Sequence, residues 1–255
     1  MSAPIYLPLN LAGVPAVLLD QPWIGWREVL EDGKPKKRPF QIGFPMEHAS
    51  NDEAKEAARA EIGTPQREPV LRNANPEVKH WRNAGDVREV LSLEPGLFDG
   101  FGIVLTAAAG LTLIDLDHVR DRETGALEAW AERMVDTFDS WTEVSVSGTG
   151  IHILCRGQLA GAGFNSYLDG DQAMRIEAYS RARFAYLTGH VLHDAPVAER
   201  QHLVTLLADS VCPAGPSTVS PAGAIRGAEM APILAGARND TLFRIARGFV
   251  RGARP

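Results

Sequence analysis

Leu111-Thr112-Leu113-Ile114-Asp115-Leu116-Asp117 is an apolar run that ends in two carboxylates. Alternate residues of a β-strand face the same side, so Asp115 and Asp117 are expected to project from one face and Leu116 from the other. Two like charges at that range repel unless a cation lies between them. Hard divalent ions such as Mg²⁺ take oxygen ligands and often share them with phosphates. The pair indicates a metal site for phosphate chemistry, although Asp is also common where strands end.

The segments around this run predict an α+β fold with mainly antiparallel sheets. Strands are expected at 22–26, 38–42, 101–106, 111–117, 143–147, 151–155, 175–179 and 184–188. We expect hairpins to pair 101–106 with 111–117, 143–147 with 151–155, and 175–179 with 184–188. Helices are expected at 53–61, 86–91, 126–138 and 197–208. Too few strand–helix–strand units are present for a doubly wound parallel sheet.

The C-terminal region changes composition. Residues 212–227 are rich in Pro, Gly, Ser and Ala, which predicts a linker that we place at 211–236. Asn239 is expected to cap a basic helix that runs to about Val250. The apolar face of that helix has no evident partner in the sequence, so residues 237–255 are expected to open a further helical domain.

Composition restricts the class of protein. The chain has 255 residues, 45% hydrophobic and 23% charged, which is ordinary for a soluble globular protein. It contains no apolar run of the roughly 18 residues that span a membrane. Its N-terminus lacks the basic-then-apolar order of a secretory signal peptide. Its two cysteines cannot form a zinc site of several Cys ligands, so a reducing cytoplasm is the expected location. The net charge of −6 argues against a dedicated duplex-DNA binder.

A second motif is Ser145-Val146-Ser147-Gly148-Thr149-Gly150-Ile151-His152. Its small residues allow backbone N–H groups to turn toward an anion, and its hydroxyls add further donors. His152 begins the next strand, where it could donate to a phosphate oxygen. The alternative is a plain hairpin turn followed by a half-buried histidine.

A third motif is Arg175-Ile176-Glu177-Ala178-Tyr179. Glu177 interrupts a strand with apolar neighbours, so it could supply the third carboxylate of a two-ion site. The alternative is simple alternation, with Glu177 facing water. Arg181 and Arg183 follow and could clamp a triphosphate, or could be surface turn residues.

A basic cluster is formed by Lys34, Lys36, Lys37 and Arg38. It could guide a nucleic-acid template or a nucleotide, although a charge run is commonly a solvated loop. Three tryptophans could stack on bases or belong to the core, with the core favoured: Trp23, Trp26 and Trp81.

The order of these motifs resembles the archaeo-eukaryotic primase superfamily, and most of all the primase-polymerase domains of phage and plasmid replication proteins. The resemblance extends from about Trp23, through Lys34-Pro35-Lys36-Lys37-Arg38-Pro39, to about Gly189. The stretch Ala237-Arg238-Asn239-Asp240-Thr241-Leu242-Phe243 is similar to the opening of the helical primase C-terminal region. On this basis residues 1–210 are assigned to the catalytic domain.

The resemblance implies two α/β modules, one of them like an RNA-recognition fold. It implies that two divalent ions, Mg²⁺ or Mn²⁺, are held by Asp115, Asp117 and Glu177. It also implies that His152 binds the nucleotide phosphates, with a basic residue at Arg183. Many members have Ser two places before the His, where this chain has Gly150, a trait of the phage-like branch. Which hydroxyl of Ser145, Ser147 or Thr149 touches phosphate therefore stays open.

The expected activity is template-directed nucleotidyl transfer, with dNTP or NTP as substrate and single-stranded DNA as template. A helicase domain or protein is a candidate partner, and no membrane is involved. Three alternatives remain: a metal-dependent nuclease or phosphohydrolase, a non-catalytic nucleotide- or DNA-binding module of a replication initiator, and a purely structural domain.

Overall fold

The computed structural model describes residues 6–40, 42, 82–93, 95–161, 163–167 and 175–211. The chain divides into two units, Met1–Leu105 with Ala182–His190, and Thr106–Arg181 with Val191–Pro255. It is α+β, and its strand pairs within the described residues are antiparallel, which confirms the predicted α+β class with mainly antiparallel sheets. No helix of the described parts is long and apolar enough to cross a membrane. The helices predicted at 53–61 and 239–250, and the linker beyond Val211, lie outside the described residues.

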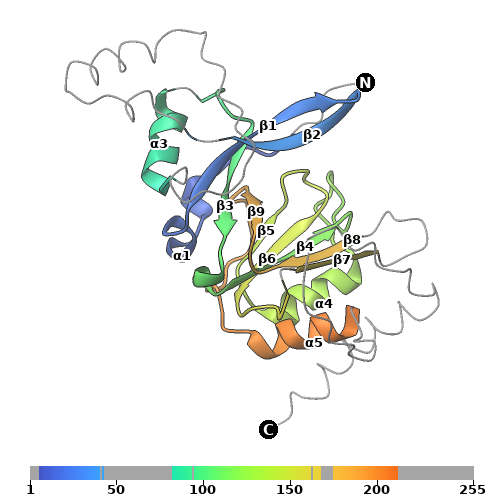
Figure 1. Ribbon diagram of the computed structural model, residues 1–255. Helices are drawn as coiled ribbons and strands as arrows, with labels where there is room; N and C mark the ends of the chain where they lie inside the picture. The colour runs from blue at the N-terminus through green and yellow to red at the C-terminus, as the bar shows by residue number, and fades with distance from the viewer. Residues whose placement is uncertain are drawn as a thin grey trace. The chain divides into compact units, whose positions relative to one another are not determined.

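The first unit contains a four-stranded sheet in the order β2-β1-β3-β9 (Figure 1). Its strands are β1 (Trp23–Glu31), β2 (Lys34–Phe40), β3 (Gly100–Leu105) and β9 (Arg183–Leu187). Its helices are η1 (Leu11–Gly13), α1 (Ala16–Leu19) and α3 (Ala84–Leu93). Asp32 and Gly33 both have positive φ, 52° and 73°, which suits the tight turn between β1 and β2. Strand β1 is longer than the strand predicted at 22–26, because it continues to Glu31.

Gly102 lies in β3, between Ile24 of β1 and Tyr186 of β9. A Cβ at this position would lie 2.2 Å from the Ala185 carbonyl oxygen and 2.7 Å from Tyr186 Cα, both backbone atoms. Gly102→Ala is therefore expected to lower the free energy of unfolding by about 1–3 kcal/mol, measured by urea denaturation. Gly96→Ala is the control, because a Cβ there meets nothing within 4 Å. Equal effects of the two substitutions would contradict this close approach.

The second unit contains a six-stranded sheet in the order β10-β5-β6-β4-β8-β7. Its strands are β4 (Leu111–Asp117), β5 (Thr142–Val144), β6 (Ile151–Arg156), β7 (Gly163–Tyr167), β8 (Arg175–Tyr179) and β10 (Val191–His193). Its helices are η4 (Ala107–Ala109), α4 (Ala129–Phe138) and α5 (Gln201–Val211). Figure 1 shows α4 and α5 on one face of the sheet. Ile114 and Leu116 belong to the core cluster that includes α4 and α5 residues, so the opposite face of β4 carries Asp115 and Asp117.

Two predicted hairpins are wrong. Strands β3 and β4 belong to different sheets, and so do β8 and β9, although each pair is close in sequence. The connection after β3 forms the 3₁₀ helix η4, in which the Thr106 side chain accepts a hydrogen bond from the Ala109 N–H. After β8, Ala182 has a positive φ of 55° and its N–H donates to the Leu105 carbonyl. Both connections carry the chain from one sheet to the other. The third predicted hairpin, β5 with β6, is confirmed.

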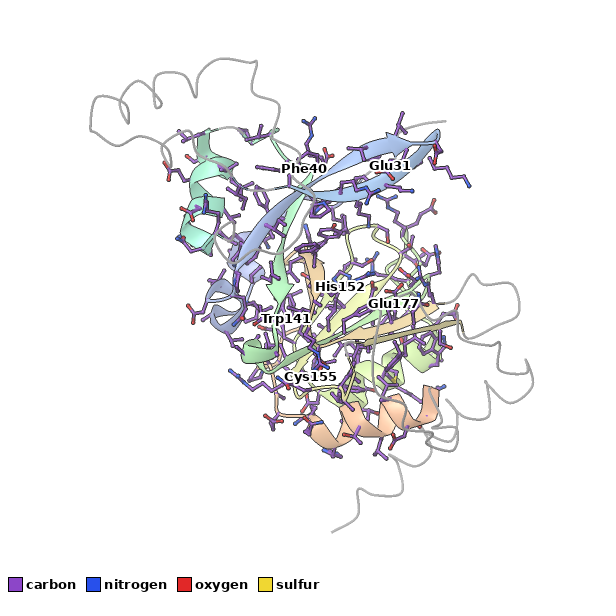
Figure 2. The ribbon with its side chains drawn as sticks, in the orientation of Figure 1. Glu31, Phe40, Trp141, His152, Cys155 and Glu177 are labelled. Carbon is purple, nitrogen blue, oxygen red and sulfur yellow. The ribbon has the colours of Figure 1, made fainter. Side chains whose placement is uncertain are left out.

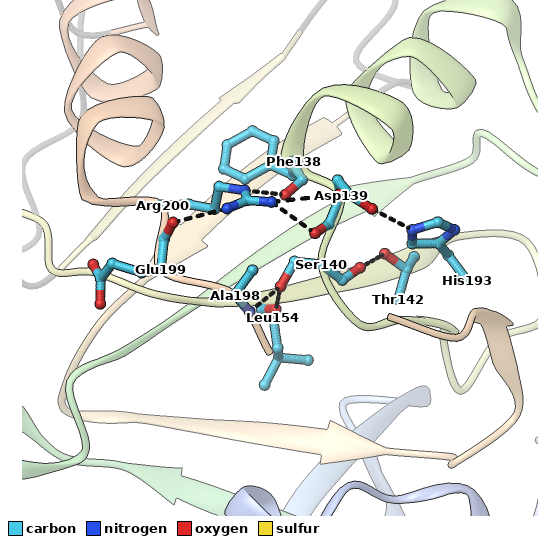
Figure 3. Close-up of polar contacts among 9 residues, drawn as sticks. All are labelled: Phe138, Asp139, Ser140, Thr142, Leu154, His193, Ala198, Glu199 and Arg200. Carbon is cyan, nitrogen blue, oxygen red and sulfur yellow. Dashed lines mark hydrogen bonds and ion pairs between the residues drawn. The ribbon is translucent and has the colours of Figure 1, made fainter. Parts of the chain in front are cut away.

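A polar network joins the end of α4 to β10 and to the start of α5 (Figure 3). Asp139, which has a φ of 37°, lies 3.1 Å from His193 Nε2 and 3.5 Å from Arg200 Nη2 through its two carboxylate oxygens. Arg200 also donates to the carbonyl oxygens of Phe138 and Asp139. Because cationic donors favour a helix C-terminus, Arg200 stabilises the end of α4 while fixing the start of α5.

Candidate active site

A row of polar side chains crosses five strands of the six-stranded sheet. On β4, Asp115 is the register partner of His152 on β6 and of Glu177 on β8. His152 is in turn the partner of Glu143 on β5, and Glu177 of Asn165 on β7. Directly opposite residues of antiparallel strands point to the same face. These five residues therefore form one polar row, on the face away from α4 and α5. Figure 2 shows His152 and Glu177 within this sheet.

Asp117 shares the face of the polar row, two residues beyond Asp115 on β4, and its register partner is Arg175. The Arg175 guanidinium lies 2.7 Å from Glu177 Oε1, and its Nε donates to Asn165 Oδ1 at 3.1 Å. Glu177 is only 3% exposed, so the alternative in which it faces water is wrong. Arg175 instead supplies the positive charge that this buried carboxylate requires.

The three predicted metal ligands are brought to one face of two adjacent strands. Their donors are all carboxylate oxygens, which is the chemistry that Mg²⁺ or Mn²⁺ takes. In the arrangement seen, however, no three His, Cys, Asp or Glu side chains of the described residues form a metal-ligand cluster, and Glu177 is engaged by Arg175. The donor set and its strand register fit a hard divalent cation, while the two-ion site itself stays a prediction.

His152 is held between two carboxylates. Its Nδ1 lies 2.8 Å from Glu143 Oε1, and its Nε2 lies 3.6 Å from Asp115 Oδ1. His152 is 6% exposed and Glu143 is fully buried. We assign a proton to Nδ1, which then donates to the Glu143 carboxylate, while Nε2 lies on the side of Asp115. Glu143 was missed by the sequence analysis. The feature of the sequence that could have indicated Glu143 is a charged residue inside the buried strand that precedes the glycine-rich turn.

The turn from Ser145 to Gly150 is a closed hairpin turn. Ser145 N–H donates to the Gly150 carbonyl, and Gly148 N–H donates to the Ser145 carbonyl, each at 2.9 Å. Thr149 N–H donates to Ser147 Oγ at 3.3 Å. These N–H groups serve the turn itself, so they do not form the open anion nest that its glycines suggested. What the turn presents is a chain of hydroxyls, with Ser147 Oγ 3.1 Å from Ser145 Oγ and 3.0 Å from Thr149 Oγ1.

Arg120, which follows β4, braces this turn. Its N–H donates to the Thr149 carbonyl and its Nη1 donates to the Gly148 carbonyl, both at 2.9 Å. Gly148 has a φ of 77°, a conformation that favours glycine. A Cβ on Gly150 would lie 2.6 Å from the Leu116 carbonyl oxygen. The turn is therefore held close against the end of β4, beside the two aspartates.

The remaining predicted residues belong to other elements. Arg183 is on β9 in the first unit, and Arg181 Nη2 donates to the Ala160 carbonyl at 3.3 Å in the second. The basic cluster lies on the exposed strand β2. Trp23 and Trp26 are fully buried, which confirms their core role, and Trp81 lies outside the described residues.

Part of the chain is similar to a known protein. No protein-family model matches the chain. A stretch of 93 residues is 33% identical to the DNA primase-polymerase of Nitratiruptor phage NrS-1. The stretch makes up 36% of this chain but only 13% of the phage protein. Together with the motifs above, this identity supports a relationship between the chain and primase-polymerases over part of their lengths.

Proposed function

We propose that the chain is the nucleotidyl-transferring part of a DNA primase-polymerase of the archaeo-eukaryotic primase superfamily, working in phage or plasmid replication. The observation that carries the proposal is the strand register that places Asp115 beside both His152 and Glu177, with Asp117 on the same face. The partial identity to a phage primase-polymerase supports the same reaction class. The substrates proposed are dNTPs or NTPs on a single-stranded DNA template, in the cytoplasm, with a helicase as a further partner.

In this proposal Asp115, Asp117 and Glu177 hold two divalent ions, Mg²⁺ or Mn²⁺. Such ions lower the pKa of an attacking 3′-hydroxyl and neutralise charge on the transferring phosphate. The protein's own contribution is mainly positioning and charge screening. His152, fixed by Glu143, and the hydroxyls of Ser145, Ser147 and Thr149 hold the triphosphate. Arg175 neutralises Glu177 when no other cation engages that carboxylate.

The test is incubation of the purified chain with labelled dNTPs or NTPs, Mg²⁺ or Mn²⁺, and single-stranded DNA with and without a primer. The expected result is a ladder of products whose composition follows the template. Cleavage of DNA, or release of phosphate without a template, would identify a nuclease or phosphohydrolase instead. Binding of DNA and nucleotide without any product under these conditions would identify a non-catalytic module.

A further inference from the structure

The β1–β2 hairpin continues beyond its sheet as a two-stranded ribbon. Strand β1 pairs with β3 only from Trp23 to Trp26, whereas its pairing with β2 continues to Glu31. Figure 1 shows the far halves of β1 and β2 running on together past β3. Within the first unit, residues 27–38 therefore form a ribbon with two faces of its own.

The register divides the ribbon into a basic face and an aromatic face. Cross-strand partners share a face, and successive residues alternate between faces. The basic face carries Arg27, Val29, Glu31, Lys34, Lys36 and Arg38. The aromatic face carries Glu28, Leu30, Pro35 and Lys37, and at the base of the ribbon it continues into Trp26 and Pro39. The predicted basic cluster is thus split, because Lys37 points away from its three neighbours.

Side-chain contacts agree with this division. On the basic face, Glu31 forms ion pairs with Lys36, whose Nζ lies 3.0 Å from Oε2, and with Arg38. On the aromatic face, the Nζ of Lys37 lies 5.5 Å from the ring centroid of Tyr6 and 5.9 Å from that of Trp26. These distances are those of cation–π contacts, so Lys37 belongs to an aromatic cluster.

The basic face is a patch of positive charge on a chain whose net charge is −6. It holds four cationic side chains and only Glu31 as an anion. The two cations that contact Glu31 lower its pKa to about 2, so the carboxylate stays ionised at neutral pH and offsets part of their charge. Lys36 and Arg38 nevertheless remain 49% and 47% exposed. A polyanion approaching this acidic protein would be attracted to the face and repelled by much of the remaining surface.

The spacing of the cations suits a nucleic-acid backbone. Lys34, Lys36 and Arg38 occur at alternate positions of β2, and alternate residues of a strand are about 6.6–6.8 Å apart. This repeat is comparable to the separation of consecutive phosphates along an extended single strand. Arg27, the register partner of Arg38, widens the face on β1.

We propose that the basic face of the ribbon binds the phosphate backbone of single-stranded nucleic acid, and that Glu31 is an internal competitor for Lys36 and Arg38. The assignment of the partner as nucleic acid rests on the proposed function. The competitor lowers affinity for any one stretch of backbone, which suits a protein that must move along its template.

The test compares two adjacent lysines on opposite faces. Binding of a fluorescent oligo-dT is measured by anisotropy across a salt series, without nucleotide or divalent ion. Lys36→Ala is expected to weaken binding by about fivefold at about 0.1 M salt and to reduce the slope of log affinity against log salt by about 0.7. Lys37→Ala is expected to leave that slope unchanged, because Lys37 lies on the aromatic face.

A third variant tests the competitor. Glu31→Gln is expected to tighten oligo-dT binding several-fold at low salt, because Lys36 and Arg38 are released to phosphate. Equal losses for Lys36→Ala and Lys37→Ala, or weaker binding of Glu31→Gln, would overturn the proposal. So would displacement of oligo-dT by polyglutamate as readily as by unlabelled oligo-dT. Thermal unfolding of each variant excludes misfolding as the cause.

The outcomes separate this proposal from the proposed function. The ribbon proposal alone would be contradicted if the unaltered chain made template-directed products and Lys36→Ala had no effect on oligo-dT binding. If the slopes of log affinity against log salt were as predicted but no product formed, the polymerase function would be contradicted and the ribbon would remain a nucleic-acid-binding surface.

Discussion

Asp115→Asn is expected to abolish nucleotide incorporation while leaving the fold intact. Asp115 lies in the central part of the six-stranded sheet, where it is the register partner of both His152 and Glu177. Asn has nearly the same shape but no charge, so it cannot hold a divalent ion as a carboxylate does. Losing several kcal/mol of charge stabilisation in the transition state corresponds to a decrease in rate of at least about a thousandfold. The measurement is incorporation of labelled nucleotide into a primed template.

The control for this substitution is Asp136→Asn, which makes the same chemical change at an exposed position of α4. Both variants are expected to unfold at urea concentrations close to that of the unaltered chain. Glu177→Gln should resemble Asp115→Asn in activity, because Glu177 is the proposed third ligand. Full incorporation by Asp115→Asn would show that the Asp115 carboxylate is not needed for nucleotidyl transfer.

Glu143→Ala is expected to weaken nucleotide binding by about 10–100-fold, by analogy with the loss seen when the carboxylate that orients a metal-ligating histidine is removed. The Nδ1–H of His152 would lose the acceptor at 2.8 Å, and the ring could then rotate or change tautomer. The loss of this buried partner should also lower the free energy of unfolding by about 1–3 kcal/mol. Nucleotide affinity is measured by calorimetry and by the KM for incorporation.

Glu143→Gln is the matched variant, since its amide oxygen can still accept from Nδ1–H. It should recover a large part of the affinity that Glu143→Ala loses. A ¹⁵N NMR spectrum of the His152 ring reports its tautomer, which a change in stability alone would not alter. The Nδ1–H form should dominate in the unaltered chain and in Glu143→Gln. A mixture of the two tautomers should appear in Glu143→Ala. Identical ring spectra for all three would show that Glu143 does not position the histidine.

The local parts of the site were predictable from sequence, and the long-range parts were not. The alternation in 111–117 indicated that Asp115 and Asp117 share a face, and the Gly148–Gly150 turn indicated the pairing of β5 with β6. The pairing of β4 with β8 joins segments far apart in the chain, and no local pattern specifies its register. Glu143 was missed for the same reason, because its role appears only when His152 lies opposite it.

The two wrong hairpins have a common cause. Short connections between strands normally favour pairing of sequence neighbours, so 101–106 was paired with 111–117 and 175–179 with 184–188. Strand β3 instead pairs with β1 and β9, and β8 pairs with β4 and with its preceding neighbour β7. Strand β3 is buried along its whole length, so its sequence shows no alternation between a buried and a solvent-facing side. The local pattern therefore could not reveal which strands β3 pairs with.

The position of β9 has a consequence for the newly made polypeptide. This edge strand of the first unit comes from Arg183–Leu187, after most of the second unit's strands have been translated. Asn10 N–H likewise lacks its acceptor until then, because it donates to the Thr188 carbonyl at 2.7 Å. The four-stranded sheet of the first unit therefore cannot be completed on the ribosome until most strands of the six-stranded sheet have been synthesised.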